Sequence, residues 1–457
     1  MTVEELSQII KENGIVGAGG AGFPTYVKID KRANTILMNC AECEPLLKLH
    51  RQLLKVHAQE ILRTFAMIAD VVEAEEAIIG IKGEYKSTIE ALNQYLPQYP
   101  KVRIHELPSA YPMGDEVVLI YEATGKVISP GGLPIEAGVA VFNVETVYNV
   151  YRALEKNTPV VDKVVTVVGE VNNPITVRVP LGTPLGEVVA MAGGEKAVEK
   201  RSGAAGLDDA HELVYLVGGP MMGRLGTRYD PVTRTTNAIL ILPKDHQIIQ
   251  KKLMPASIGM KRAASSCCQC RTCTDLCPRH NLGHPIEPHR FMQAMSNHEY
   301  SDLDAFLNLF FCSSCGLCEM FSCPQGLSPR SLIADCKDGL RKAGIKAPKG
   351  VVPAPVQESR AYRRAPEKRL EARLGLSQYD APAPLDDQVR PVHMVRELFS
   401  QHIGAPAVCQ LKKGDKVTRG QVIAAAAQGL SVPVHASICG IVTDVTDKYV
   451  EITSEQN

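Results

Sequence analysis

The sequence is organised around two cysteine runs, Cys267-Cys-Gln-Cys270-Arg-Thr-Cys273-Thr-Asp-Leu-Cys277-Pro278 and Cys312-Ser-Ser-Cys315-Gly-Leu-Cys318-Glu-Met-Phe-Ser-Cys323-Pro324. The first has the spacing C-x2-C-x2-C-x3-C-P, which is typical of bacterial proteins that hold two iron–sulfur clusters. Three thiolates two residues apart can reach one cubane, whereas the fourth cysteine, redirected by the following proline, serves the other cluster. The spacing therefore predicts two crossed [4Fe–4S] ligand sets: Cys267, Cys270, Cys273 and Cys323 in one, and Cys312, Cys315, Cys318 and Cys277 in the other.

The second run departs from this spacing, because four residues instead of three separate Cys318 from Cys323. An extra residue before the outgoing cysteine is easier to absorb than one inside the C-x2-C-x2-C segment. Zinc would use pairs of C-x2-C separated by a longer spacer, and a disulfide framework belongs to short secreted chains. Zinc stays an alternative, and Cys268 is expected to be a small apolar filler.

Length and composition set the frame for these sites. A chain of 457 residues is expected to form three or four domains. Lys plus Arg and Asp plus Glu number 50 each, so the charge balance gives no indication of a nucleic-acid or anionic-membrane partner. No apolar run is long enough for a transmembrane helix, and the N-terminus has no secretory signal. Fourteen cysteines in such a chain indicate a reducing compartment, the bacterial cytoplasm.

The N-terminal segment leads into a glycine-rich loop. Residues 2–13 are predicted to form an amphipathic helix, capped by Thr2 and Glu5. The next stretch is Gly17-Ala-Gly19-Gly20-Ala-Gly22-Phe23-Pro-Thr25, whose glycines let backbone N–H groups approach a phosphate. Its G-x-G-x-x-G pattern is weak by itself, since a helix and not a strand precedes it, and a simple turn is the alternative.

A short predicted strand at 35–39 follows and ends in Asn39-Cys-Ala-Glu42-Cys-Glu44-Pro45. Polar groups at the end of a strand, after a glycine loop, are where an open α/β sheet places a ligand. Cys40 and Cys43 form a C-x-x-C, for which ordinary buried thiols are preferred to a redox pair. A helix is predicted over residues 46–70.

These motifs resemble the flavin- and NADH-binding subunit of respiratory complex I, whose family shows GRGGAGFPT followed by NADESEP. Tyr111-Pro-Met-Gly-Asp-Glu116 and Phe142-Asn143-Val-Glu-Thr146 resemble further motifs of that family, in the same order. The resemblance implies a Rossmann-like FMN/NADH domain over residues 1–158, although Ala18 and Ala41 replace the family's arginine and aspartate. It implies that the FMN phosphate is held by Gly17, Gly19, Gly20, Gly22 and Lys28. It also implies that Asn39, Glu42, Glu116, Asn143 and Thr146 line the flavin, and that Phe23 and Glu44 lie toward the nicotinamide nucleotide.

Four further segments follow the flavin domain. Residues 159–252 resemble the small β-grasp (SLBB) module, and Thr235-Thr-Asn237-Ala-Ile-Leu within them resembles RnfC-like proteins. Residues 253–345 would form a helical two-cluster ferredoxin-like domain, and 346–390, rich in proline, alanine and arginine, a partly mobile linker. Residues 391–457 look like a barrel-sandwich hybrid without an exposed lysine at its hairpin tip, and are therefore interpreted as a docking or structural module. The fold class is multidomain α/β and α+β.

The order of these parts is typical of one family. RnfC proteins carry the hybrid domain before the flavin motif, whereas here it comes last, as in the cobalamin reductases of propanediol-utilisation microcompartments. This resemblance implies electron transfer from NADH through FMN and the clusters to cobalamin, as cob(III) goes to cob(II) and cob(I). An adenosyltransferase is the implied partner inside a bacterial microcompartment, and shell proteins are further candidates. The sequence lacks the D-x-H-x-x-G motif of base-off cobalamin binding.

Three alternatives stay open at this stage. The chain could be an RnfC-like subunit that passes electrons between NADH and a ferredoxin or another partner. It could be a cluster-bearing scaffold without flavin, since Ala18 replaces the arginine of the flavin motif. It could also be a structural shell-associated protein with zinc in the cysteine sites.

Overall fold

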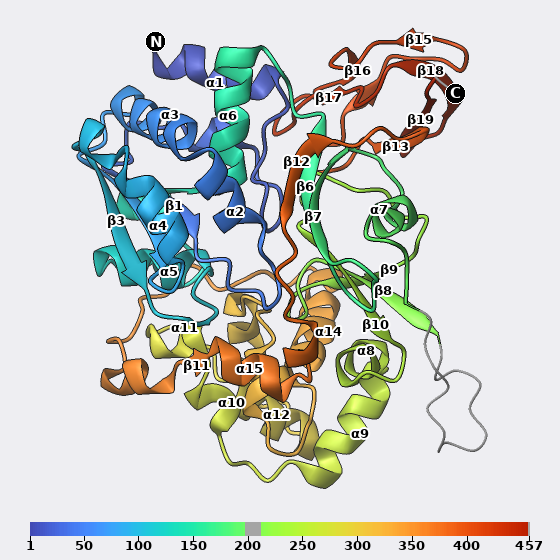
Figure 1. Ribbon diagram of the computed structural model, residues 1–457. Helices are drawn as coiled ribbons and strands as arrows, with labels where there is room; N and C mark the ends of the chain where they lie inside the picture. Colours follow the sequence, from blue (N-terminus) through green and yellow to red (C-terminus); the bar gives the residue numbers. More distant parts are fainter. Residues whose placement is uncertain (197–211, 456–457) are drawn as a thin grey trace.

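The computed structural model describes residues 1–196 and 212–455. Figure 1 shows how the regions of the chain are arranged. The N-terminal region contains a parallel sheet of order β3-β2-β1-β5. Its strands are β1 (Thr35–Cys40), β2 (Glu76–Lys82), β3 (Val102–Leu107) and β5 (Val139–Asn143). Its helices are α1 (Val3–Glu12), α2 (Leu49–Val56), α3 (Ala58–Val71), α4 (Lys86–Asn93), α5 (Glu116–Thr124) and α6 (Val144–Lys156).

Helices cover both faces of this sheet, which explains why its inner strands β1 and β2 are buried at nearly every position, whereas the edge strand β3 carries Arg103, His105 and Glu106. Leu37 and Ile78 pack on one face with residues of α5. Ile36, Met38 and Ile79 pack on the other face with residues of α2, α3 and α6. The ends of β1 and β5 are therefore held rigidly at one edge of the sheet.

Two local predictions in this region can be compared directly with the structure. The capping box of α1 is confirmed, since Glu5 N donates to Thr2 Oγ1 at 3.2 Å and Thr2 N donates to Glu5 Oε2 at 2.8 Å. The single helix predicted over residues 46–70 is wrong, because the chain breaks at His57 between α2 and α3. His57 Nε2 lies 2.7 Å from Asp387 Oδ2 and its ring stacks on Tyr148, so a tertiary contact overrides helix propensity here.

The next region is built on a sheet of order β12-β7-β6-β10-β8-β9. Its elements are β6 (Asp162–Gly169), β7 (Ile175–Pro180), α7 (Leu185–Met191), β8 (Leu213–Val217), β9 (Arg224–Gly226), β10 (Ala238–Pro243) and β12 (Leu385–Val389). Strands β6 and β7 form an antiparallel pair joined through residues 170–174, which include Asn172 and Asn173. Strand β12 comes from much later in the chain and pairs with β7 in parallel.

The cysteine runs lie in a helical region with a small core of its own, which includes Ile286, Phe291 and Leu332. Its helices are α8 (Gln247–Leu253), α9 (Ala256–Ser266), α10 (Thr272–Asp275), α11 (Pro278–Asn281), α12 (Pro288–Asn297), α13 (Leu303–Leu307) and α14 (Pro329–Lys342). A short π-helix, η6 (Cys318–Ser322), lies within the second cysteine run. The region sits below both sheets in Figure 1.

Residues 346–390, predicted as a linker, connect the cysteine region to the last one, but they do not form a free tether. They contain η7 (Glu358–Arg363), β11 (Ala365–Pro366), α15 (Glu367–Arg373) and η8 (Ser377–Tyr379). Strand β11 pairs with β4 (Ala110–Tyr111), and Glu367 forms a buried ion pair with Lys82. Leu370 and Leu374 are buried, so a few apolar and charged anchors order a segment without strong periodicity.

The C-terminal region consists of two small sheets of orders β13-β19-β18-β15 and β14-β16-β17. Its strands are β13 (Met394–Leu398), β14 (Val408–Cys409), β15 (Lys416–Val417), β16 (Val422–Ala425), β17 (Val434–His435), β18 (Gly440–Val445) and β19 (Tyr449–Thr453). They enclose a separate core that includes Val395, Ile423 and Ile452. Figure 1 shows this region at the upper right, beside the N-terminal region and above the central sheet.

Asp162 joins three of these regions. Its carboxylate accepts two bonds of 2.7 Å from Arg152 of α6, one of 2.9 Å from Arg178 of β7 and one of 2.7 Å from Arg419 of the C-terminal region. Burial acts to raise the pKa of Asp162, but Arg152 and Arg178 outweigh it and hold the pKa at about 2. The carboxylate is therefore charged at neutral pH and compensates a cluster of guanidinium groups.

We expect Asp162→Asn to destabilise the protein, because it leaves three guanidinium groups around a neutral amide. Breaking a buried ion pair from one side costs about 3 kcal/mol or more. Scanning calorimetry should show a first unfolding transition lowered by several degrees. Asp70→Asn is the matched control, since its ion pair with Lys101 is exposed and worth less than about 1 kcal/mol. Equal melting temperatures for the two variants would contradict this role of Asp162.

Candidate functional site

The glycine-rich loop lies between α1 and η1 (Thr25–Lys28) and is closed at its base. Gly17 N donates to Phe23 O at 2.8 Å, and Ala18 N donates to Thr146 Oγ1 at 2.9 Å. Within the described residues, the N–H groups of residues 19–22 have no hydrogen-bond partner. Gly20 and Gly22 have φ of +71° and +70°, a conformation that turns successive N–H groups to one side. The loop therefore offers unpaired donors that fit a phosphate.

The predicted flavin-lining asparagines lie opposite one another in the sheet. Asn39 lies one residue before the end of β1 and is the register partner of Asn143, which ends β5 and caps α6. Asn39 Nδ2 donates to Gly114 O at 3.0 Å, and Asn143 Nδ2 lies 3.1 Å from His50 Nε2. The glycine loop reaches the same place, because a Cβ added to Gly19 would lie 3.1 Å from Asn143 Nδ2. The structure thus brings the glycine-rich loop, residues 39–45 and residues 142–146 to the carboxyl edge of the parallel strands, where open α/β sheets bind ligands.

Lys28 and Glu116 bring residues 111–116 to this edge. Lys28 Nζ lies 3.5 Å from Glu116 Oε1 and donates to Val141 O at 2.7 Å. The same ammonium lies 5.9 Å from the centroid of the Phe23 ring. Lys28 is partly exposed, so its charge is available to an anion bound in the neighbouring loop.

Glu42 is buried and Glu44 partly buried, and both already have protein partners. Glu42 Oε1 accepts from His50 N at 2.7 Å, while Glu44 accepts from Met221 N and Met222 N at 2.9 Å each. Burial raises the pKa of both carboxyls. These contacts give both side chains a structural role, and their predicted contacts with the flavin and the nicotinamide stay predictions.

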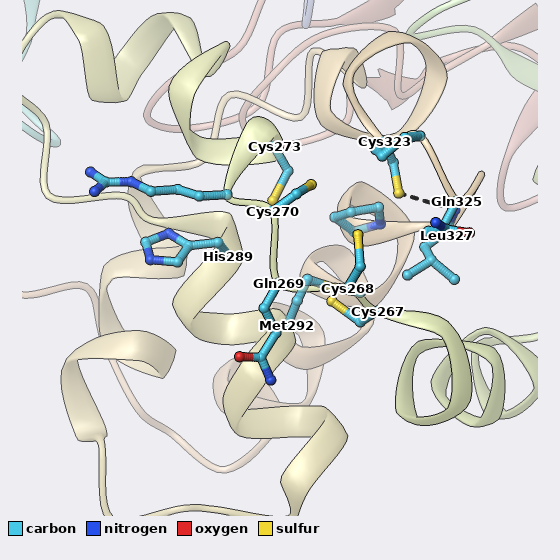
Figure 2. A pocket seen from close by; sticks show the side chains of 13 residues that line it. Cys267, Cys268, Gln269, Cys270, Cys273, His289, Met292, Cys323, Gln325 and Leu327 are labelled. Carbon is cyan, nitrogen blue, oxygen red and sulfur yellow. Dashed lines mark hydrogen bonds between the residues drawn. The ribbon is translucent and has the colours of Figure 1, made fainter.

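Four cysteines from the two runs line one cavity. Cys267, Cys270, Cys273 and Cys323 surround it together with Cys268, His289, Met292 and Leu327 (Figure 2). The cavity encloses ≈ 390 Å³ of empty space, part of it open to solvent. Leu327 N donates to Cys323 Sγ at 3.4 Å, a bond that stabilises a thiolate at this position. These are the four cysteines of the first predicted ligand set.

The other four cysteines lie near one another on the inner side of the region. Burial first, and then the nearby Cys312, raise the pKa of Cys277 to about 12. Burial, Cys277 and Cys312 raise the pKa of Cys315, and burial, Cys312 and Cys315 raise that of Cys318. Burial raises the pKa of any cysteine in this way, and a bound cluster would hold these four sulfurs as thiolates.

The irregular spacing of the second run has a structural counterpart. The first run reaches Cys277 through the short α-helix α10, whereas the second reaches Cys323 through the π-helix η6. A π-turn accommodates one residue more than an α-turn. The extra residue between Cys318 and Cys323 is absorbed there, and Cys323 still reaches the first cavity.

Residues 111–116 also contact the second cysteine set. Tyr111 Oη donates to Cys315 O at 2.6 Å, and Arg279, two residues after Cys277, lies 2.9 Å from Asp115 Oδ1. The carbonyl of Gly114 in the same segment accepts from Asn39. Residues 111–116 therefore connect the flavin edge to the inner cysteines, a contact that no sequence motif indicated.

No helix among the described residues is long and apolar enough to cross a membrane.

The family comparisons cover most of the chain. The Nuo51 FMN-binding domain matches residues 10–152, the SLBB domain 164–225, the 4Fe-4S dicluster domain 266–328, and the RnfC barrel sandwich hybrid domain 383–457. These matches confirm the predicted fold class and the expected FMN and iron–sulfur cofactors.

Curated relatives match over nearly the full length. Cobalamin reductase PduS of Salmonella typhimurium is 40% identical over 99% of this chain and 97% of its own. Cobalamin reductase PduS of Citrobacter freundii is 40% identical over 98% of this chain and 96% of its own. A component of the ion-translocating oxidoreductase complex of Edwardsiella ictaluri is 32% identical over 61% of this chain and 32% of its own.

Proposed function

Because this chain belongs to the PduS family of cobalamin reductases, we propose that it oxidises NADH and reduces cobalamin in single-electron steps. NADH gives up a hydride, which carries two electrons, and becomes NAD⁺. Two successive one-electron reductions take cob(III)alamin to cob(II)alamin and then to cob(I)alamin. The observation that carries the proposal is the contact of residues 111–116 with both the flavin edge and the inner cysteines.

FMN converts a two-electron donor into single electrons, and iron–sulfur clusters carry one electron each. In this chain, the free N–H groups of the loop and the ammonium of Lys28 would hold the flavin phosphate. Asn39, Glu42, Glu116, Asn143 and Thr146 would surround the rest of the flavin. Phe23 and Glu44 would lie toward the nicotinamide.

Two crossed cysteine sets would hold the clusters. Cys267, Cys270, Cys273 and Cys323 would bind the one whose cavity opens to solvent, and Cys277, Cys312, Cys315 and Cys318 the inner one. The inner set adjoins the flavin-motif segment 111–116, so it is the nearer of the two to the flavin edge.

The product also indicates the partners. Cob(I)alamin is a strong nucleophile that must be used at once, so an adenosyltransferase that converts it to adenosylcobalamin is the partner we propose. The proposed place is a bacterial microcompartment in the cytoplasm, where shell proteins would be further contacts. Both proposals rest on the family.

An anaerobic acceptor assay tests this function. With NADH as donor, the purified protein should convert cob(III)alamin to cob(II)alamin at a rate proportional to enzyme. The likeness to a component of an ion-translocating oxidoreductase complex makes ferredoxin the second acceptor to try. Reduction of ferredoxin without reduction of cobalamin would contradict the cobalamin reductase and support an RnfC-like electron carrier.

A further inference from the structure

Two segments from outside the N-terminal region contact the glycine-rich loop. Ile403 N, in the C-terminal region, donates to Gly22 O at 3.3 Å. A Cβ added to Gly22 would lie 3.0 Å from Gln401 O and 3.1 Å from Thr235 Cγ2. The Gly22 end of the loop is therefore contacted by residue 235 of the central region and residues 401–403 of the C-terminal region, while Gly20 and Ala21 stay exposed.

Arg234 fixes both segments in place. Its backbone N donates to Gln401 Oε1 at 3.1 Å, and its Nη2 donates to Pro433 O at 2.8 Å. Gly14, at the end of α1, lies so close that a Cβ there would approach Pro433 O to 2.9 Å and Arg234 Nη2 to 3.0 Å. Arg234 is only 2% exposed, so three regions meet tightly around it.

This junction contains buried polar atoms that lack partners. In the part of the chain that the structure describes, both ring nitrogens of His402 and Oδ1 of Asn237 are shielded from solvent without a hydrogen bond. Nε and Nη1 of the buried Arg234 are unpaired in the same way. Leaving such groups unpaired costs about 1–3 kcal/mol each, so a ligand or ordered water must satisfy them.

The positions of these atoms relate them to the loop. Asn237 Nδ2 would lie 3.7 Å from a Cβ on Gly19, and the His402 Cα 3.3 Å from a Cβ on Gly22. Gly19 and Gly22 bound the stretch of four unpaired N–H groups. Burial and the charge of Arg234 lower the pKa of His402 to about 4, so its neutral ring has one donor and one acceptor at pH 7.

We propose that a ring N–H of His402 and the side-chain Nδ2 of Asn237 complete the flavin site by donating hydrogen bonds to the phosphate end of FMN. The site is then shared by three regions, and the C-terminal region, expected from sequence to be a docking or structural module, contributes directly to cofactor binding. This inference rests on the proposed function, because it requires that FMN bind at the glycine loop.

The test compares flavin affinities of the full-length apo-protein by fluorescence titration with FMN and with riboflavin, which lacks the phosphate. His402→Ala and Asn237→Ala should each weaken FMN binding roughly 3- to 10-fold, the value of one hydrogen bond, and change riboflavin binding little. His402→Gln, which keeps a donor and an acceptor, should restore part of the loss. His393→Ala is the control, an exposed histidine of the same region.

Each outcome separates this inference from the proposed function. If wild-type protein binds no FMN, the proposed function fails. If it binds FMN and both alanine variants bind it equally well, the inference is overturned, and water alone satisfies the buried atoms. An equal loss for FMN and riboflavin would also overturn it, since that pattern reports a disturbed fold and not a phosphate contact.

Discussion

Replacing Cys270 and Cys323 together by alanine is expected to leave one intact cluster, with about four iron atoms per chain. Both cysteines line the same cavity, so the double variant loses only the ligands of that site. Replacing Cys270 and Cys277 together should remove both clusters, because these cysteines belong to different sets in the crossed arrangement. Iron analysis of reconstituted protein, with electron paramagnetic resonance of the reduced samples, measures both results. Each double variant should lose cobalamin reduction.

The same pair of variants distinguishes the crossed arrangement from the straight one, in which each cysteine run holds its own cluster. In that case Cys270 and Cys323 would serve different clusters, and their joint loss would leave no iron. Cys268→Ala is the control: this exposed cysteine lines the cavity but lies outside the ligand spacing, and its loss should leave about eight iron atoms. No iron in the Cys270/Cys323 variant would contradict the crossed sets.

Replacing Lys28 by alanine is expected to weaken FMN binding by about 10- to 100-fold. A hydrogen bond between charged groups contributes about 1.5–3 kcal/mol, and Lys28 is the cation placed beside the loop with unpaired N–H groups. Fluorescence titration of the apo-protein measures the change. Lys28→Arg should lose less, since it keeps the charge.

Lys31→Ala is the matched control for this variant. It removes a lysine three positions away whose ion pair with Glu73 is exposed, and FMN affinity should be unchanged. If Lys28→Ala binds FMN as tightly as Lys31→Ala does, the phosphate does not lie where the complex I motifs imply.

The parts of the fold predictable from sequence are those with short-range signals. The capping box at Thr2 follows from a local pattern, and the resemblance to the complex I flavin subunit implies that Asn39 and Asn143 belong to one site. The cysteine spacing predicts which thiols come together. The extra residue before Cys323 is visible in the sequence. The π-helix that accommodates it could not be predicted, because a π-turn differs from an α-turn only by one more residue and has no residue pattern of its own here.

The contacts missed from sequence join distant regions. The carboxylate of Glu44 accepts from the N–H groups of Met221 and Met222, which carry no side-chain signal. Tyr111 bonds a backbone carbonyl in the second cysteine run, and Ile403 bonds one in the glycine loop. Backbone groups are common to all residues, so composition and spacing contain no information about such bonds.

The measurement that tests the central claim most directly is an anaerobic absorbance titration of the reconstituted protein. NADH is added first and cob(III)alamin afterwards. If one chain takes hydride and releases single electrons, the flavin and cluster bands bleach with NADH and recover as cob(II)alamin appears. Cluster absorption that is present but unchanged by NADH would contradict the account, because electrons would then have to enter from another protein.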